Sequence, residues 1–174
     1  VYHSDVIVRA DSPYRTLADL RGAVFAFVDP MSFSGDLAVR ALLAEQGYDP
    51  KSFFRRVIYT SSHDNSITAV LSGLVDGAAV DSHTLAGFLE RHPAERAEIR
   101  VVARSFSAGN PPFVAGPVLD SGLRRQLQEA FLQMDRDPEG RAALQAMGVE
   151  RFAPPSERLY DPVRRAEELV RGRS

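Results

Sequence analysis

The stretch that decides the fold is "AVFAFVDPMSFSGDLAVRALLAEQGY", residues 23–48. It opens with an unbroken apolar run, typical of a strand covered on both faces. Apolar residues then recur at helical spacing up to Gly47, a common helix stop. Ser32, Ser34 and Gly35 lie between strand and helix. Such a loop leaves backbone N–H groups unpaired, the two hydroxyls add donors, and a glycine lets a ligand approach closely, so the stretch suggests an oxyanion site.

A simpler interpretation is that Ser32 or Ser34 only caps a helix, because serine is preferred at that position. However, "YTSSHDNSITAVLSG", residues 59–73, repeats the layout with Ser62 and His63 before a second helix. In an open α/β sheet both loops lie at the carboxyl ends of strands, where ligands bind. A histidine donates a hydrogen bond to an anion whether neutral or charged. Two such loops favour the anion site over simple capping.

Strands and helices alternate through the first hundred residues, which predicts an α/β lobe with a largely parallel sheet. The segment 55–60 predicts a second inner strand, and a helix is expected from residue 63 to Leu74. Further strands are expected at 5–10, 23–28, 77–82 and 98–105, and further helices at 36–47 and 83–92.

Beyond Ser105 the composition changes. The segment "FSAGNPPFVAGP" is rich in proline and glycine, and three helices follow, in 121–135, 137–148 and 160–172. No strand accompanies these helices, although an amphipathic helix needs a surface to cover. We expect the missing sheet, and a leader, in sequence that precedes Val1.

Composition and motifs exclude several functions. A net charge of −2 over 174 residues, without a basic tail, argues against nucleic-acid binding. The absence of cysteine excludes disulfides, thiolate metal sites and a cysteine nucleophile. No HxxxH, HExxH or GxSxG motif occurs, so we expect no metal, no cofactor and no catalytic residue. No apolar run approaches the ~20 residues that span a bilayer, so no membrane span is expected.

The two loops and their surroundings resemble the phosphate/phosphite/phosphonate substrate-binding proteins of ABC transporters, which are type 2 periplasmic binding proteins. The resemblance rests on "YHSDVIVRADSPYRTLADLRG", "AFVDPMSFSGDLAVRALLAEQGYDPKSFF", "YTSSHDNSITAVLSGLVDGAAVDS" and "DPEGRAALQAMGVERF", in family order. It implies an α/β fold of the type 2 periplasmic-binding-protein kind, with one three-layer α/β lobe and the C-terminal helical part of a second lobe, joined by crossover strands. The implied boundaries are 1–7 for the first crossover, 8–103 for the ligand-binding lobe, and 104–174 for the second crossover and the rest.

The resemblance also implies ligand contacts. The family's Ser-Thr-Ser hydroxyl cradle falls on Ser32, Phe33 and Ser34, and Phe33 offers only its backbone N–H. A crossover tyrosine that touches the anion falls on Tyr2, and the family histidine falls on His63.

Family members that bind aminoalkylphosphonates hold the ligand's ammonium group with two acids, which fall at or near His83 and Pro111. Neither position is acidic here, although Asp81 is close, so the resemblance disfavours 2-aminoethylphosphonate. From the residues alone, Asp81 either orients His63 or His83, or caps the helix that begins near His83. His83 either faces the cleft or lies on the surface.

The sequence therefore predicts a periplasmic or extracellular solute-binding component of an ABC transporter. Its ligand is a small phosphorus oxyanion, its partners are permease subunits, and it has no chemistry of its own. Alternatives are an extracellular sensing domain fused to a signalling domain, the effector domain of a transcription regulator with the same fold, or an enzyme. An incomplete lobe also predicts exposed core and self-association.

Overall fold

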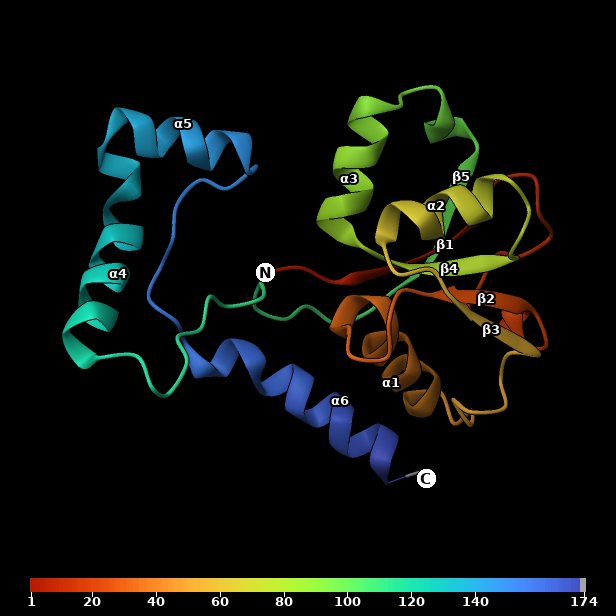
Figure 1. The fold of residues 1–174 in the computed structure, drawn as a ribbon. Coiled ribbons are helices and arrows are strands. Elements are labelled where there is room, and N and C mark those ends of the chain that lie inside the picture. The colour runs from red at the N-terminus through yellow and green to blue at the C-terminus, as the bar shows by residue number, and fades with distance from the viewer. Residues whose placement is uncertain (173–174) are drawn as a thin grey trace. The chain divides into compact units, whose positions relative to one another are not determined.

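The computed structural model describes residues 1–172, which fall into two compact units (Figure 1). The first unit comprises Val1–Asn110 and the C-terminal segment that begins at Arg158. The second unit is Pro111–Glu157. Each unit is described by itself below.

The first unit is built on a five-stranded sheet in the order β3-β2-β4-β1-β5. The strands are β1 (Ser4–Arg9), β2 (Val24–Phe27), β3 (Arg56–Tyr59), β4 (Gly77–Asp81) and β5 (Ile99–Arg104). All five predicted strands are therefore present.

The prediction of a largely parallel sheet was wrong for β1. Strand β2 pairs in parallel with β3 and β4, but β1 runs antiparallel to both of its neighbours, β4 and β5. The reason lies in the connection from β1 to β2, which holds only the short 3-10 helix η1 (Ala18–Leu20). Without a long crossover helix the chain simply turns back, which reverses its direction.

The prediction of an inner strand at 55–60 was also wrong, because β3 lies at the edge of the sheet. Val57 and Ile58 are only half-buried, and Arg56 and Tyr59 are exposed. A short apolar run cannot by itself distinguish a strand covered on both sides from one with a free edge.

Helices cover both faces of the sheet, as Figure 1 shows: α2 (His63–Leu71) and α3 (Ser82–Arg91) on one face and α1 (Ala38–Glu45) on the other. A π-helical turn, η2 (Phe33–Leu37), runs directly into α1, and a 3-10 turn, η3 (Glu95–Ala97), precedes β5. The predicted three-layer α/β arrangement is confirmed.

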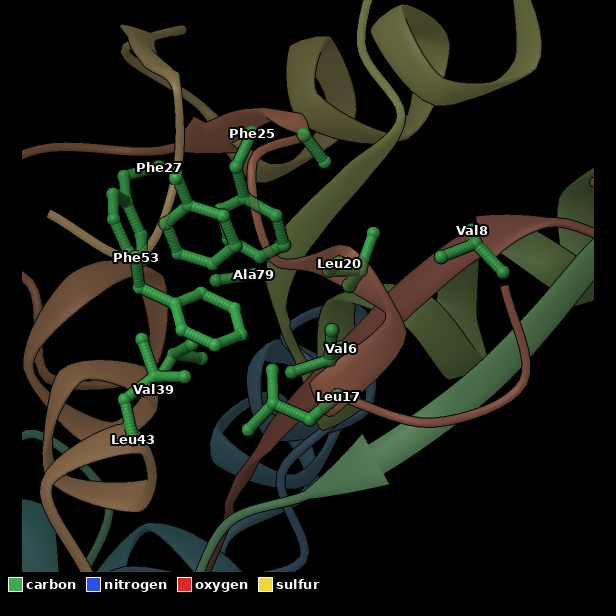
Figure 2. Close-up of a cluster of buried hydrophobic side chains, with 12 residues drawn as sticks. Val6, Val8, Leu17, Leu20, Phe25, Phe27, Val39, Leu43, Phe53 and Ala79 are labelled. Carbon is green, nitrogen blue, oxygen red and sulfur yellow. The ribbon is translucent and has the colours of Figure 1, made fainter. Parts of the chain in front are cut away.

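Two hydrophobic clusters join these layers. Alternate residues of β1 point to opposite faces, as the period of a strand requires. Val6 joins Phe25, Phe27, Val39 and Leu43 beneath α1 (Figure 2). On the other face, the cluster beneath α2 and α3 includes Ile7, Ala26, Ile67, Val70 and Leu85. The sheet is thus a rigid base from which the loops at its edges project.

The helix expected to reach Leu74 ends earlier, at Leu71. Gly73 adopts a φ of 73°, and the N–H of Leu74 donates to the carbonyl of Ala69. This αL stop satisfies the last carbonyls of α2 and turns Leu74 outward, where it is 67% exposed. The predicted stop at Gly47 is confirmed by the same geometry, with a φ of 83°.

The three helices predicted beyond Ser105 are present as α4 (Ser121–Gln133), α5 (Pro138–Ala146) and α6 (Asp161–Arg171), with 3-10 turns η4 (Met134–Arg136) and η5 (Glu157–Tyr160). Helix α6 does have a surface to cover, because it belongs to the first unit and lies against α1. In the second unit, α4 and α5 accompany an aromatic cluster of Phe113, Phe131 and Phe152. Among the helices of residues 1–172, none is both long and apolar enough to cross a membrane.

Two segments run side by side where the chain enters and leaves the sheet. Tyr2 and Ala108 form an antiparallel bridge, with N–H to carbonyl distances of 3.0 and 2.9 Å. One step inward, the N–H of Ser4 donates to the hydroxyl of Ser105 at 2.9 Å. This pairing fixes Tyr2 at the rim of the sheet.

Candidate anion-binding site

The topology brings the predicted site residues to one edge of the sheet. Strands β2, β3 and β4 run in the same direction, so their carboxyl ends meet at that edge. Because β1 is reversed, its first residues lie there too, and the end of β5 joins them. The residues at this edge are Tyr2, Ser32 to Gly35, Ser62, His63, Asp81, His83 and Phe106.

The capping interpretation holds for Ser32. Its Oγ accepts a hydrogen bond from the N–H of Gly35 at 3.0 Å, at the start of η2. The N–H groups of Phe33 and Ser34 find no acceptor within residues 1–172. A cap and two open donors therefore coexist at one helix start, where the helix dipole also favours negative charge.

Gly35 has a structural role that the sequence did not reveal. A Cβ at this position would lie 2.6 Å from the Cβ of Val28 and 2.8 Å from the Oγ of Ser32. Its N–H is held by Ser32, and its carbonyl accepts from the N–H of Val28 at 2.9 Å. Packing against Val28 accounts for the glycine, and its expected role in ligand approach stays a prediction.

Ser34 and Tyr2 bring two hydroxyls together. Ser34 is 3% exposed. Its polar neighbour is the Tyr2 phenol, whose pKa is raised by burial and then by the Asp81 carboxylate, while the Ser34 hydroxyl acts in the opposite sense. Tyr2 is therefore a neutral donor at ordinary pH.

The second helix start follows the same plan. The Oγ of Ser62 accepts from the N–H of Asn65 at 3.1 Å and so caps α2. The N–H groups of His63 and Asp64 find no acceptor in the part of the chain that is described. Ser62, like Ser32, is a cap that leaves neighbouring donors open.

His63 is held in one orientation. Its Nδ1 accepts a hydrogen bond from the backbone N–H of Asp81 at 3.1 Å. An acceptor Nδ1 on a neutral ring places the proton on Nε2, which then serves as a donor. Burial lowers the pKa of His63, and the nearby Asp81 and Asp64 carboxylates only partly oppose this. The ring is thus a neutral, pre-oriented donor.

Asp81 performs two of the roles considered for it. Its backbone orients His63, and its carboxylate caps α3 by accepting from the N–H of Thr84 at 2.8 Å. His83 is exposed, and its ring lies nearly parallel to that of Tyr2 at a centroid distance of 6.4 Å. The position that is acidic in aminoalkylphosphonate binders therefore carries an aromatic contact.

An aromatic wall lines the same edge. Phe33 contacts Tyr2 edge-on at 5.6 Å between centroids and meets Phe106 at 5.7 Å. The sequence analysis missed Phe106. It lies two residues after the end of β5, so the rule that ligands bind at the carboxyl ends of strands could have identified it.

This edge of the sheet therefore carries several neutral hydrogen-bond donors. They are the N–H groups of two helix starts, the hydroxyls of Tyr2 and Ser34, and Nε2 of His63. In residues 1–172 no group of three or more His, Cys, Asp or Glu side chains has the arrangement of a metal site. The chemistry of the edge is that of anion binding by hydrogen bonds.

A sheet with one reversed strand, and paired segments leading into and out of it, defines the class: this is the fold of type 2 periplasmic binding proteins. Residues 1–160 match the family described as "ABC transporter, phosphonate, periplasmic substrate-binding protein". The chain belongs to this family of phosphonate-binding periplasmic proteins.

Known proteins agree with this assignment. The chain is 26% identical over 167 residues to the phosphonates-binding periplasmic protein of Escherichia coli K12, covering 94% of this chain and 49% of the relative. The binding component of an ABC phosphonate transporter from Pseudomonas aeruginosa has a similar structure, with a TM-score of 0.80 and 22% identity over 99% of this chain and 58% of that one.

A protein from Prochlorococcus marinus solved in complex with methylphosphonate has a TM-score of 0.78 and 21% identity, over 98% of this chain and 66% of its own. The TM-scores show that these proteins share the fold of this chain, and at identities this low the comparison shows the fold alone. The chain spans about half the length of the Escherichia coli relative.

Proposed function

We propose that the protein is the solute-binding component of an ABC transporter for a small phosphorus oxyanion, and that it binds this anion at the sheet edge described above. The observation that carries the proposal is the hydroxyl of Ser34. It is buried, its polar neighbour is the Tyr2 phenol, and it stands at the start of η2, where the N–H groups of Phe33 and Ser34 have no acceptor within residues 1–172. Open N–H groups and hydroxyls at a helix start favour an anion there.

The ligand contacts follow from the donors. Oxygens of the anion accept from Ser34, Tyr2 and Nε2 of His63, together with the backbone N–H groups of Phe33 and His63. Ser32, Gly35 and Ser62 hold the two helix starts in place. Family membership favours this role over a sensor or a regulator, and we expect binding without turnover.

The fourth substituent on phosphorus is small and uncharged in this proposal. Phe33, Phe106 and His83 present rings where an ammonium group would need a carboxylate partner. Phosphite, phosphate and methylphosphonate therefore fit better than 2-aminoethylphosphonate, because neither position that is acidic in aminoalkylphosphonate binders, at or near His83 and Pro111, is acidic here.

Hinge closure, a periplasmic location and permease partners belong to the same proposal. We infer that residues 1–7 and the segment from residue 104 are the two crossovers, and that the protein closes on its ligand about them like a hinge. The protein works in the periplasm and delivers its ligand to permease subunits.

Self-association is a separate prediction, and it rests on the second unit. Phe113 and Val118 there are 67% and 98% exposed. Light scattering checks it: a clean monomer at high concentration rules it out.

Isothermal titration of the full-length protein tests the binding proposal. The ligands are phosphite, phosphate, methylphosphonate and 2-aminoethylphosphonate, and the variants are Ser34→Ala and His63→Ala. We expect binding of one small oxyanion at micromolar affinity or tighter, weakened in both variants. Heat from none of the four would overturn the proposal.

A further inference from the structure

Within residues 1–172, only one of the two oxygens of the Asp81 carboxylate accepts hydrogen bonds. Its Oδ1 accepts from the N–H of Thr84 at 2.8 Å and from the Thr84 hydroxyl at 3.2 Å. No hydrogen bond within residues 1–172 reaches Oδ2. The negative charge nevertheless acts on the site, since it raises the pKa of Tyr2 and opposes the burial that lowers the pKa of His63.

No positive side chain balances this charge. Within residues 1–172, no arginine or lysine forms an ion pair with Asp81 or contributes to the pKa shift of Tyr2 or His63. The other acid beside His63, Asp64, is paired with Arg91 at 3.6 Å. A fully ionised, doubly charged phosphonate would therefore meet an unbalanced carboxylate, which is unfavourable at short range.

We propose, on the basis of the function proposed above, that the site selects a phosphorus oxyanion that carries one acidic hydroxyl, and that this hydroxyl donates a hydrogen bond to Oδ2 of Asp81. The remaining oxygens of the ligand accept from Ser34 and His63. Asp81 is then a specificity-determining residue. An anion of the same shape without the hydroxyl sets an oxygen against the carboxylate, with no proton between them, and is rejected.

Several titratable groups surround Asp81, and each bears on a test by pH. They are Tyr2 and His3 from the first segment, His63 and Asp64 from α2, and His83 from α3. Burial lowers the pKa of His63 from its ordinary 6.5 and raises that of Tyr2 from its ordinary 10.0. Between about pH 7 and pH 9 both therefore stay neutral, and the second ionisation of the ligand dominates.

The experiment compares two probes of nearly equal shape, methylphosphonate and methanesulfonate, by isothermal titration of the full-length protein. The sulfonate carries one negative charge and no hydroxyl. The variant is Asp81→Asn, which keeps an oxygen to cap α3, removes the charge and adds a donor. His83→Gln is the control for the neighbouring imidazole.

We expect the unmodified protein to prefer methylphosphonate by at least roughly 100-fold. Its affinity should fall about tenfold per pH unit above the second pKa of the ligand. The Asp81→Asn variant should bind methylphosphonate about tenfold more weakly near pH 7, and its affinity should no longer fall with pH. It should bind methanesulfonate more tightly than the unmodified protein does. His83→Gln should keep the slope, and any change of affinity should be similar for the two probes.

Three results overturn the inference and leave the proposed function standing: an affinity for methylphosphonate that is level or rises with pH, a preference that survives in Asp81→Asn, or a slope that disappears in His83→Gln. If phosphite, phosphate and methylphosphonate all fail to bind at every pH, the proposed function falls and this inference falls with it.

Discussion

The backbone N–H of Asp81 donates a hydrogen bond to Nδ1 of His63 at 3.1 Å. This contact joins the end of β4 to the start of α2 and fixes which ring nitrogen carries the proton. Because a backbone group does the orienting, the side chain of Asp81 remains available to cap α3. The relationship explains how one residue acts on both the donor and the acceptor sides of the site.

The donor role of His63 can be tested with two near-isosteres. His63→Asn keeps an atom that accepts from the Asp81 N–H but loses the outer donor, so ligand affinity should fall by about tenfold or more. His63→Gln keeps a donor near the position of Nε2 and should retain more affinity. Isothermal titration compares the two, and equal losses would contradict the assignment of Nε2 as the donor.

The buried, neutral state of His63 predicts a stability change at acid pH. Burial lowers its folded pKa below the ordinary 6.5, so the unfolded chain binds more protons between the two values. The free energy of unfolding should therefore decline as pH falls from about 6.5 through the lowered pKa of His63. Above pH 6.5 this contribution should be fully present. Urea unfolding at a series of pH values measures this, and His63→Gln should remove its share of the decline. An identical decline in that variant would assign the effect to other groups.

An ion pair at the start of α1 should contribute strongly to stability. Asp36 is 4% exposed, pairs with Arg40 and accepts from the hydroxyl of Tyr59 at 3.0 Å, while the guanidinium also lies 4.6 Å from the Phe27 ring centroid. Arg40→Met leaves the buried carboxylate uncompensated and should cost about 3 kcal/mol of unfolding free energy.

Urea unfolding measures that cost. The double variant Asp36→Asn with Arg40→Met removes both charges and should be more stable than Arg40→Met alone. A double variant that is as unstable as the sum of the two single changes would show that the pair does not act as a unit.

Gly35 should tolerate no side chain. An added Cβ would lie 2.6 Å from the Cβ of Val28, so Gly35→Ala should lower the unfolding free energy by about 1–3 kcal/mol. Gly116→Ala is the matched control, since its Cβ would meet nothing within 4 Å. Thermal unfolding of the two variants checks the contrast, and equal midpoints would refute it.

Local patterns in the sequence predicted the elements well, because helical and strand periodicities are local properties. The αL glycine at residue 47 and the serine caps were visible as residue types at the expected spacing. The direction of a strand and its position in the sheet are not local properties. Strand β1 is reversed and β3 lies at an edge because of how the chain connects the strands, and the periodicity of the sequence contains no information on this. Likewise, Leu74 continued the helical spacing even though Gly73 had already ended the helix.

The sequence predicted which residues form the candidate site but not the role of each residue in it. Topology brings the predicted residues to one sheet edge, yet which serine caps a helix depends on hydrogen bonds that spacing cannot reveal. Ser32 and Ser62 cap, whereas Ser34 lies beside the Tyr2 phenol. The opposing roles of the backbone and side chain of Asp81, and the contact of Phe106 with Phe33, likewise appear only in three dimensions.

The most direct test of the central claim is a crystal structure of the full-length protein with methylphosphonate. We predict that the phosphonate oxygens lie within hydrogen-bonding distance, about 2.6–3.2 Å, of the Ser34 hydroxyl, Nε2 of His63 and the N–H of Phe33. A phosphonate bound elsewhere in the protein, with the Ser34 hydroxyl and Nε2 of His63 both without a ligand contact, would contradict the account.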